Sequence, residues 1–194
     1  MIPYGFYYFG PLLVKMKVTK EDLNKVKKIL SKKGYHMKKD LAGVIEGEYE
    51  LVREDYDSIM RPYIDVYKDA YVQFKGGTTL DQHIHTKRAW VNYMKPGEYN
   101  PPHIHSNCDL SSVLFISIPE KLKKENKKWH DSKSGGPGSI SFNTAFTGNF
   151  YNAGVEQFPE EGDFWMFPYS LIHFVAPFKS KCERISVAAN FDVR

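Results

Sequence analysis

The stretch PPHIHSNCDLSSVLFISI, residues 101–118, combines two histidines one residue apart with a run of β-branched and aromatic residues. The run predicts a strand, because such residues fit a pleated and buried surface. Residues i and i+2 of a strand point to the same side, so a His-x-His step can place both imidazoles on one face of a sheet. His103 and His105 are therefore half of a candidate metal site, which needs further ligands from elsewhere in the chain.

The region around this stretch has the pattern of a β-sandwich or barrel. Short aromatic and β-branched runs separated by Pro, Gly and Asn predict strands at 89–94, 139–143, 163–168 and 185–191. Several short strands with turn signals between them are typical of sandwiches and barrels. A long polar insertion, 121–138, is expected to be either a mobile linker or a lid, and Trp129 within it slightly favours a lid.

The N-terminal part predicts strands followed by helices. Residues 1–18 alternate loosely, which indicates one or two strands broken at a Gly-Pro pair. Thr19 can cap a helix that Gly34 ends, because a Ser or Thr before an apolar repeat is a common helix start. A second helical pattern covers residues 51–75, where Pro62 either kinks the helix or belongs to its first turn.

Size and composition indicate one ordinary globular domain. The chain has 194 residues, 42% hydrophobic and 26% charged, which is typical of a soluble protein. The aromatic share of 15% favours a β-rich fold with a lined cleft. We expect a single domain over 1–194, with strands and supporting helices in 1–87 and a β core in 88–194. The net charge of +4 does not by itself indicate nucleic acid.

Cysteine usage and hydropathy suggest an intracellular protein. The two cysteines, Cys108 and Cys182, come without a secretory signal pattern, so we expect free thiols in a reducing cytoplasm. No stretch approaches the ~20 apolar residues that a membrane-spanning helix needs. The aromatic strands expected near the N-terminus could pair across a homodimer.

Further ligand candidates lie near the C-terminus. His173 follows the aromatic run in GDFWMFPYSLIHFVAP, residues 162–177, and Arg184 and Ser186 share one face of the next predicted strand. Three imidazoles converging from distant strands suit a first-row metal, Fe(II) before Zn. An inward-pointing arginine is costly unless it meets an anion, and it can hold a carboxylate through two parallel hydrogen bonds.

Three stretches carry a resemblance to a known family: residues 93–117, 162–178 and 183–191. They resemble the 2-oxoglutarate- and Fe(II)-dependent oxygenases, in particular an uncharacterised bacterial and phage branch with a His-x-His metal motif. The superfamily pattern is His-x-Asp/Glu, then a distal His, then Arg or Lys roughly ten residues later. The resemblance covers about residues 88–194. It implies a mainly β (α+β) fold, a jelly-roll, cupin-like double-stranded β-helix flanked by N-terminal helices.

The resemblance also implies an enzyme and assigns its site. Fe(II) would be bound by His103, His105 and His173, and 2-oxoglutarate by Arg184 and Ser186, with O2 as co-substrate. The implied reaction hydroxylates an unidentified small-molecule or peptide substrate and releases succinate and CO2. No catalytic residue is expected beyond the metal ligands. Three residues on neighbouring strands could line the cleft: Asn92, Tyr93 and Asn190.

Several alternatives stay open. The superfamily usually has a carboxylate at the position of His105, and Asp109 could in principle supply one, although His105 is favoured. A three-histidine site also occurs in cupin dioxygenases that use no 2-oxoglutarate, and jelly rolls also serve as non-catalytic binding modules. The other His-Ile-His, with His83 and His85, has no matching distal partners, so we expect it at best to line the cleft.

Overall fold

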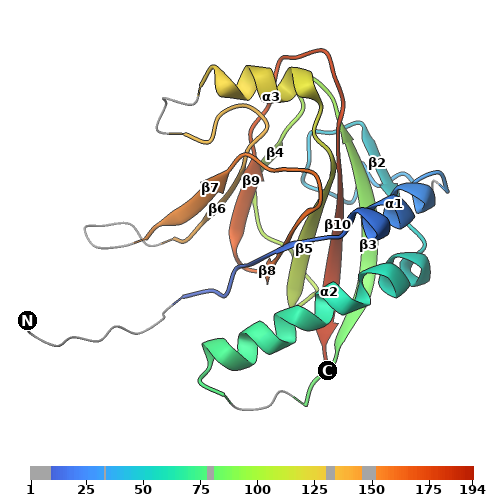
Figure 1. Cartoon of the computed structure of the whole chain (residues 1–194), viewed down its shortest axis with the longest axis vertical. Coiled ribbons are helices and arrows are strands. Elements are labelled where there is room, and N and C mark those ends of the chain that lie inside the picture. The colour runs from blue at the N-terminus through green and yellow to red at the C-terminus, as the bar shows by residue number, and fades with distance from the viewer. Residues whose placement is uncertain (1–9, 33, 78–80, 130–133, 146–151) are drawn as a thin grey trace, which may run out of the picture.

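The computed structural model describes residues 10–32, 34–77, 81–129, 134–145 and 152–194. Two antiparallel sheets face each other, and two helices cover the outer face of the larger sheet (Figure 1). This arrangement is the jelly roll with flanking helices that the sequence predicted.

The larger sheet has six strands and holds most of the core. Its order is β1 (Val14–Lys17), β8 (Asp163–Pro168), β5 (Leu110–Ser117), β10 (Arg184–Val193), β3 (Ile84–Met94) and β2 (Gly47–Glu50). The smaller sheet has the order β4 (Asn100–His103), β9 (Ile172–Val175), β6 (Ile140–Asn143) and β7 (Gly154–Gln157). The strands β2, β4, β7 and β9 were not predicted; three of them, GEYE, NPPH and GVEQ, contain few of the β-branched and aromatic residues that indicate a strand.

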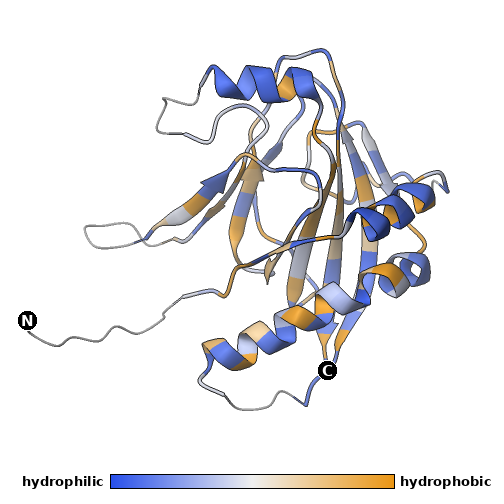
Figure 2. Cartoon of the chain, in the orientation of Figure 1, coloured by the Kyte–Doolittle hydropathy of each residue, from blue (hydrophilic) through white to orange (hydrophobic). Residues whose placement is uncertain are grey.

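The two faces of the larger sheet have different surroundings, the helices on one side and the smaller sheet on the other. On β10, Val187 and Ala189 are fully buried against the helix side, whereas Arg184 and Ser186 face the smaller sheet. This follows from the two-residue period of a strand, which sends successive side chains to opposite faces. Figure 2 shows the resulting mixture of apolar and polar positions along the strands. The inner face can therefore hold polar groups without weakening the outer, apolar core.

The helix α1 (Lys20–Ile29) starts where the sequence predicted and ends earlier. Thr19 is its N-cap and accepts a hydrogen bond from the backbone N–H of Asp22, with an N–O distance of 3.2 Å. The helix ends at Ile29 rather than near Gly34, whose N–H instead donates to the carbonyl of Glu50 on β2 at 3.0 Å. Of the strands expected in residues 1–18, β1 is present, and residues 1–9 lie outside the described part of the chain.

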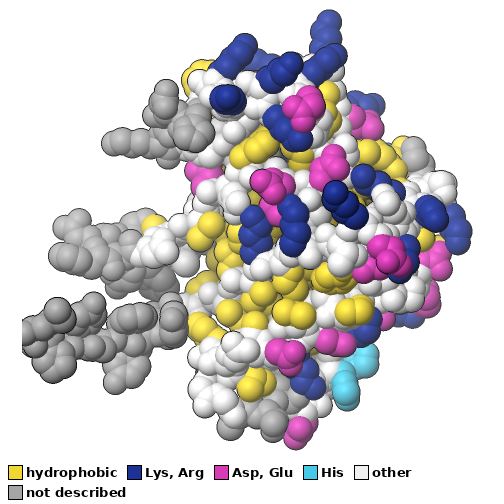
Figure 3. Space-filling view, in the orientation of Figure 1, with side chains coloured by type: hydrophobic (Ala, Val, Ile, Leu, Met, Phe, Trp, Pro, Cys, Tyr) yellow, Lys and Arg dark blue, Asp and Glu magenta, His cyan; other side chains and the backbone are white. Residues whose placement is uncertain are grey.

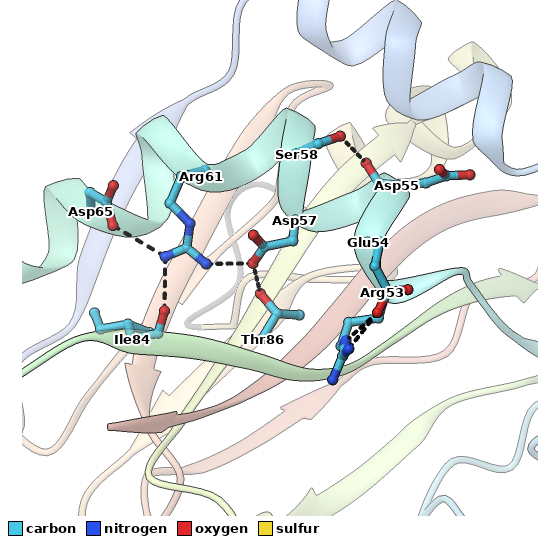
Figure 4. Close-up of polar contacts among 9 residues, drawn as sticks. All are labelled: Arg53, Glu54, Asp55, Asp57, Ser58, Arg61, Asp65, Ile84 and Thr86. Atoms are coloured by element: carbon cyan, nitrogen blue, oxygen red, sulfur yellow. Dashed lines mark hydrogen bonds and ion pairs between the residues drawn. The ribbon is translucent and has the colours of Figure 1, made fainter. Parts of the chain in front are cut away.

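The helix α2 (Arg53–Phe74) lies across β3 and is fastened to it by polar contacts (Figure 4). Arg61 donates to the carbonyl of Ile84 at 2.8 Å and pairs with Asp57, which also accepts from the hydroxyl of Thr86. Pro62 lies inside the helix and not in its first turn. These contacts fix the face of β3 that turns towards the helix.

The polar insertion begins with a helix and not with a loop, which corrects the expectation for residues 121–138. This helix, α3 (Glu120–Lys127), buries Leu122 completely. Its Glu125 carboxylate accepts hydrogen bonds from the backbone N–H groups of Lys179 and Ser180 at 2.9 and 2.7 Å. Its basic side chains gather on the surface at the top of Figure 3. The described part of the insertion is thus a docked helix, and residues 130–133 lie outside the described chain.

No helix in the described part of the chain is both long and apolar enough to cross a membrane. Cys108 and Cys182 are free, as their number and context predicted.

Candidate active site

His103 and His173 face each other across the strands β4 and β9, where they are direct register partners. Their ring centroids are 4.2 Å apart. The Nδ1 atom of His103 lies 2.7 Å from the carbonyl oxygen of Pro101, and that of His173 lies 2.9 Å from the carbonyl oxygen of Leu171. A carbonyl only accepts, so each Nδ1 carries the hydrogen and each Nε2 keeps a lone pair. Both rings are thereby prepared as metal ligands through Nε2.

His105 completes the cluster from just beyond the end of β4. Its backbone N–H donates to the carbonyl of Tyr169 at 3.0 Å, which holds the chain beside the turn before β9. Its Nε2 lies 3.2 Å from Nε2 of His173, and the two rings are parallel within 2°. One candidate ligand atom from each of the three histidines lies within 4.8 Å of the others. An ion about 2.0–2.1 Å from two imidazole nitrogens separates them by about 3 Å, so the set fits one metal.

Burial keeps these imidazoles uncharged. It lowers the pKa of His103, and it lowers the pKa of His105 to about 4, with a smaller contribution from the charge on His103. The pKa of His173 falls to about 3, first through burial and then through the other two histidines. Only a neutral imidazole can donate its lone pair to a metal, so no proton has to be displaced near pH 7.

Arg184 is the largest fully buried side chain in the described structure, with an exposed fraction of 1%. One guanidinium nitrogen donates to the carbonyl of Gly138 at 3.1 Å, and Nε has no partner within the described chain. The guanidinium carbon lies 5.3 Å from the centre of the Phe115 ring, and burial lowers the pKa of Arg184 to about 10. A buried cation that pairs with no carboxylate in the described chain is costly, which indicates that it is built to meet an anion.

A single cavity of about 480 Å³ joins the imidazoles to Arg184. This volume is in the range of small-molecule sites. The predicted site residues that line it are His103, His105, His173, Arg184, Ser186, Asn92 and Asn190. The side-chain oxygens of Asn92 and Asn190 are buried and have no hydrogen-bond partner among the described residues. The cavity wall therefore carries polar atoms that remain available to a ligand.

Tyr93 does not line this cavity, which corrects the expectation that it could. Its neighbours along β3 alternate, so Asn92 faces the cavity while Tyr93 packs against the helix-side core. Its ring lies 6.2 Å from that of Tyr49, centre to centre, in an edge-on arrangement.

The alternative ligands considered for the metal lie elsewhere. Asp109 accepts a hydrogen bond from the backbone N–H of Val193 at 2.7 Å and is not part of the three-histidine cluster. The backbone of His83 pairs with that of Arg194, and both His83 and His85 are exposed and do not line the cavity. The described residues of the insertion 121–138 do not line it either.

Among the cavity residues that the sequence reasoning missed, Glu48 has the most unusual environment. Glu48, on β2, is 1% exposed and lines the same cavity. It is the register partner of Asn92, which in turn pairs with Ser186, so the three side chains form a row across three neighbouring strands. Burial, and then the nearby carboxylate of Glu98, raises the pKa of Glu48 to about 7. The only sequence signal was the short alternation GEYE at 47–50, in a strand too brief to predict.

Comparison with protein families shows the family to which the chain belongs. The family described as "Putative 2OG-Fe(II) oxygenase" matches residues 88–190, which is more than half of the chain. The chain belongs to this family. It is therefore an oxidoreductase, and the cofactors of its class are Fe(II) and 2-oxoglutarate, with O2 as co-substrate. Comparison with curated proteins finds no significant match.

Solved structures share the fold of this oxygenase at low sequence identity. An oxidoreductase of the 2OG-Fe(II) oxygenase family from Burkholderia pseudomallei is 11% identical, with a TM-score of 0.59 over 93% of this chain and 84% of its own. A prolyl-4-hydroxylase from Pseudomonas putida is 14% identical, with a TM-score of 0.57 over 94% and 92%. A viral collagen prolyl hydroxylase from Paramecium Bursaria Chlorella virus-1, in complex with 2OG, is 15% identical, with a TM-score of 0.55 over 92% and 94%. These likenesses confirm the double-stranded β-helix.

Proposed function

We propose that this oxygenase hydroxylates an organic substrate with release of succinate and CO2, using Fe(II) bound by His103, His105 and His173. The observation that carries the proposal is Arg184, a buried guanidinium with no acidic partner in the described chain, which opens onto the same cavity as the three imidazoles. We further propose that Arg184 and Ser186 hold the distal carboxylate of 2-oxoglutarate.

The residues of the cavity fit these two groups. When bound, Fe(II) and 2-oxoglutarate supply the O2-dependent oxidation, which side chains alone cannot perform. The imidazoles of His103 and His173 are oriented by their Nδ1–H bonds to backbone carbonyls, which fixes Nε2 as the ligand atom. Arg184 is held by the carbonyl of Gly138 and by the face of Phe115, so its remaining N–H groups are preoriented for a carboxylate.

The ligand set contains no carboxylate, and this affects the charge of the site. Three neutral imidazoles leave the full double charge on the metal, whereas the usual carboxylate would remove one unit. The distal carboxylate of a dianionic cosubstrate would be held by Arg184, with its other end near the three imidazoles. We therefore expect the binding of 2-oxoglutarate to depend strongly on Arg184, because removing one partner of a buried ion pair costs about 3–5 kcal/mol.

A spectroscopic titration tests the proposal. Chelation of ferrous iron by a 2-oxoacid gives a weak visible absorption band, so the Fe(II)-loaded protein is titrated with 2-oxoglutarate under anaerobic conditions. We expect the band in the wild type, and an increase of about 100-fold or more in the 2-oxoglutarate needed to produce it in Arg184→Ala, with the iron content retained. The matched control is Arg88→Ala. Arg88 lines the same cavity but is paired with Glu50 and Asp40 at 2.8 and 3.2 Å.

Three results would contradict the proposal in different ways. An unchanged affinity in Arg184→Ala would remove this residue from the cosubstrate site. Iron binding without a band would favour a three-histidine dioxygenase that does not use 2-oxoglutarate. Absence of iron binding would indicate a non-catalytic jelly roll.

A further inference from the structure

The cavity contains a second buried ionisable side chain that the proposed function does not use. Glu48 is 1% exposed, its Oε2 atom has no hydrogen-bond partner among the described residues, and it lies outside the metal cluster. Burying a carboxylate without a partner costs several kcal/mol, so such groups are uncommon unless a ligand completes them.

Other carboxylates with comparable burial or position are paired. Asp163, 2% exposed, lies 3.0 Å from the amino groups of both Lys15 and Lys17. Asp40 lines the same cavity as Glu48 and lies 3.2 Å from the guanidinium of Arg88. The chain thus neutralises these acids with its own bases but provides none for Glu48 within the described residues.

Glu48 and Arg184 also do not neutralise each other. Each has a buried polar atom without a partner, although both side chains face the same cavity. Two opposite charges that are free to meet would pair, so their separate positions are held by the fold. Arg184 lies at the start of β10, whereas Glu48 lies on β2, and β3 separates these two strands. The cavity therefore has an anion-binding position and a separate position that attracts cations.

The surroundings of Glu48 strengthen that attraction. Glu98 adds negative potential at Glu48, and its own carboxylate is fixed by the backbone N–H groups of Glu46 and Lys95 at 3.0 and 2.7 Å. A side chain at Gly43 would have its Cβ 2.8 Å from Oε1 of Glu48, so the glycine lets the backbone approach the carboxylate closely.

From this geometry we propose that Glu48 binds a cationic nitrogen group, an alkylammonium or a guanidinium, of the molecule that enters the cavity. That this molecule is the substrate of the oxygenase rests on the proposed function; the binding of the cation does not. Glu48 lies before residues 88–190, the part that the family model matches, so this wall belongs to the part of the chain outside the shared motif. Glu48 is then a residue that determines substrate specificity.

The experiment compares two cations with neutral analogues of similar shape. The probes are Nα-acetyl-lysine amide and Nα-acetyl-arginine amide, against Nα-acetyl-norleucine amide and Nα-acetyl-citrulline amide. Binding is measured by NMR titration, first with metal-free protein and then with protein loaded with Zn(II) and 2-oxoglutarate. We expect at least one cationic probe to bind about tenfold or more tightly than its neutral analogue, since a charge-assisted hydrogen bond contributes about 1.5–3 kcal/mol. The stronger of the two cations identifies the source of the charge.

Variants show whether Glu48 is responsible. Glu48→Gln, which keeps the shape and removes the charge, should abolish the preference for the cation, whereas Glu48→Asp should retain part of it. The matched control Asp40→Asn should keep the full preference, because Asp40 is already paired with Arg88. Equal binding of cationic and neutral probes to the wild type, or a preference that survives in Glu48→Gln, would overturn the proposal.

Two further readouts separate competing roles of Glu48. A loss of Fe(II) affinity in Glu48→Gln would mean that the carboxylate balances the charge of the metal instead. A loss of 2-oxoglutarate affinity would mean that it contributes to the cosubstrate site. Since the probes are also titrated into metal-free protein, failure of the absorption band and failure of cation binding are independent results.

Discussion

Residues 83–85 and 103–105 have the same sequence, His-Ile-His, and the fold orients them in opposite ways. In the first, Ile84 is 4% exposed and both histidines are exposed. In the second, Ile104 is 53% exposed and both histidines line the cavity. The alternation of a strand makes two histidines share a face, but it does not decide which face.

The elements that pack on each segment make this decision. The first segment runs along the start of β3, beneath α2, where Ile84 joins the helix-side core and Arg61 bonds to its carbonyl (Figure 4). The second segment ends β4 in the smaller sheet, away from α1 and α2, and Leu122 of α3 is the only helix residue of the described chain in the core cluster of that sheet. There the inner face is the only buried one, so the histidines turn inward and Ile104 turns to solvent. The same tripeptide thus contributes its isoleucine to the core in one place and its two histidines to a candidate metal site in the other.

The largest expected difference between the two segments is in metal affinity. His173→Ala removes the ligand that faces the second segment, and we expect Fe(II) affinity to fall by more than about 100-fold, since changes to outer-shell partners alone cost 10–100-fold. His83→Ala is the control and should bind Fe(II) like the wild type. Iron content after anaerobic loading measures both. Equal losses of iron in the two variants would contradict the assignment of the metal site to the second segment.

The second difference is in folding stability, and here the first segment is expected to be the more sensitive to substitution. Ile84→Ala leaves a cavity in the core and should lower the free energy of unfolding by about 2–4 kcal/mol. Ile104→Ala removes an exposed side chain and should change it by less than about 0.5 kcal/mol. Urea unfolding of the metal-free proteins gives both values. Similar losses would show that Ile104 packs against something in solution.

A smaller difference in stability is expected between substitutions of two ionisable residues: Glu48, which lines the same cavity as the second segment, and His85 in the first segment. The pKa of Glu48 is about 7 in the folded protein, raised by burial and then by Glu98, against 4.5 for the free side chain. A raised carboxyl pKa means that the folded state binds the proton more tightly, so stability falls as pH rises from about 4.5 to 7. We expect Glu48→Gln to stabilise the metal-free protein by about 1–3 kcal/mol at pH 8 and by little at pH 4.5.

The control for this comparison is His85→Gln, at the exposed first segment, which should change the stability by less than about 0.5 kcal/mol at either pH. The histidine cluster and Arg184 share the cavity with Glu48, so the two proteins are compared at matched pH and not across pH. A gain for Glu48→Gln that is equal at pH 8 and pH 4.5 would mean that the charge of this carboxylate is not the cause.

Much of the barrel was predictable because its strands are long and apolar. The runs that form β5, β8 and β10 have strong β-branched and aromatic content, and the helix cap at Thr19 has a local signature. The short strands β2 and β4 were not recognisable, although they carry Glu48 and His103. Their sequences, GEYE and NPPH, contain few β-branched or aromatic residues, and long-range pairing rather than propensity makes them strands.

The sequence by itself predicted the residues of the candidate site. The order His103, His105, His173 and Arg184 along the chain resembles the motif of the family, and imidazole and guanidinium groups suit the binding of a metal and an anion. Only the tertiary structure decided which His-Ile-His faces inward, since that depends on what packs against each face. It also decided that Glu48, distant in the chain, opens onto the same cavity without a partner. Glu48 is a candidate for substrate recognition because it is buried without a partner in this cavity, which its residue type alone does not indicate.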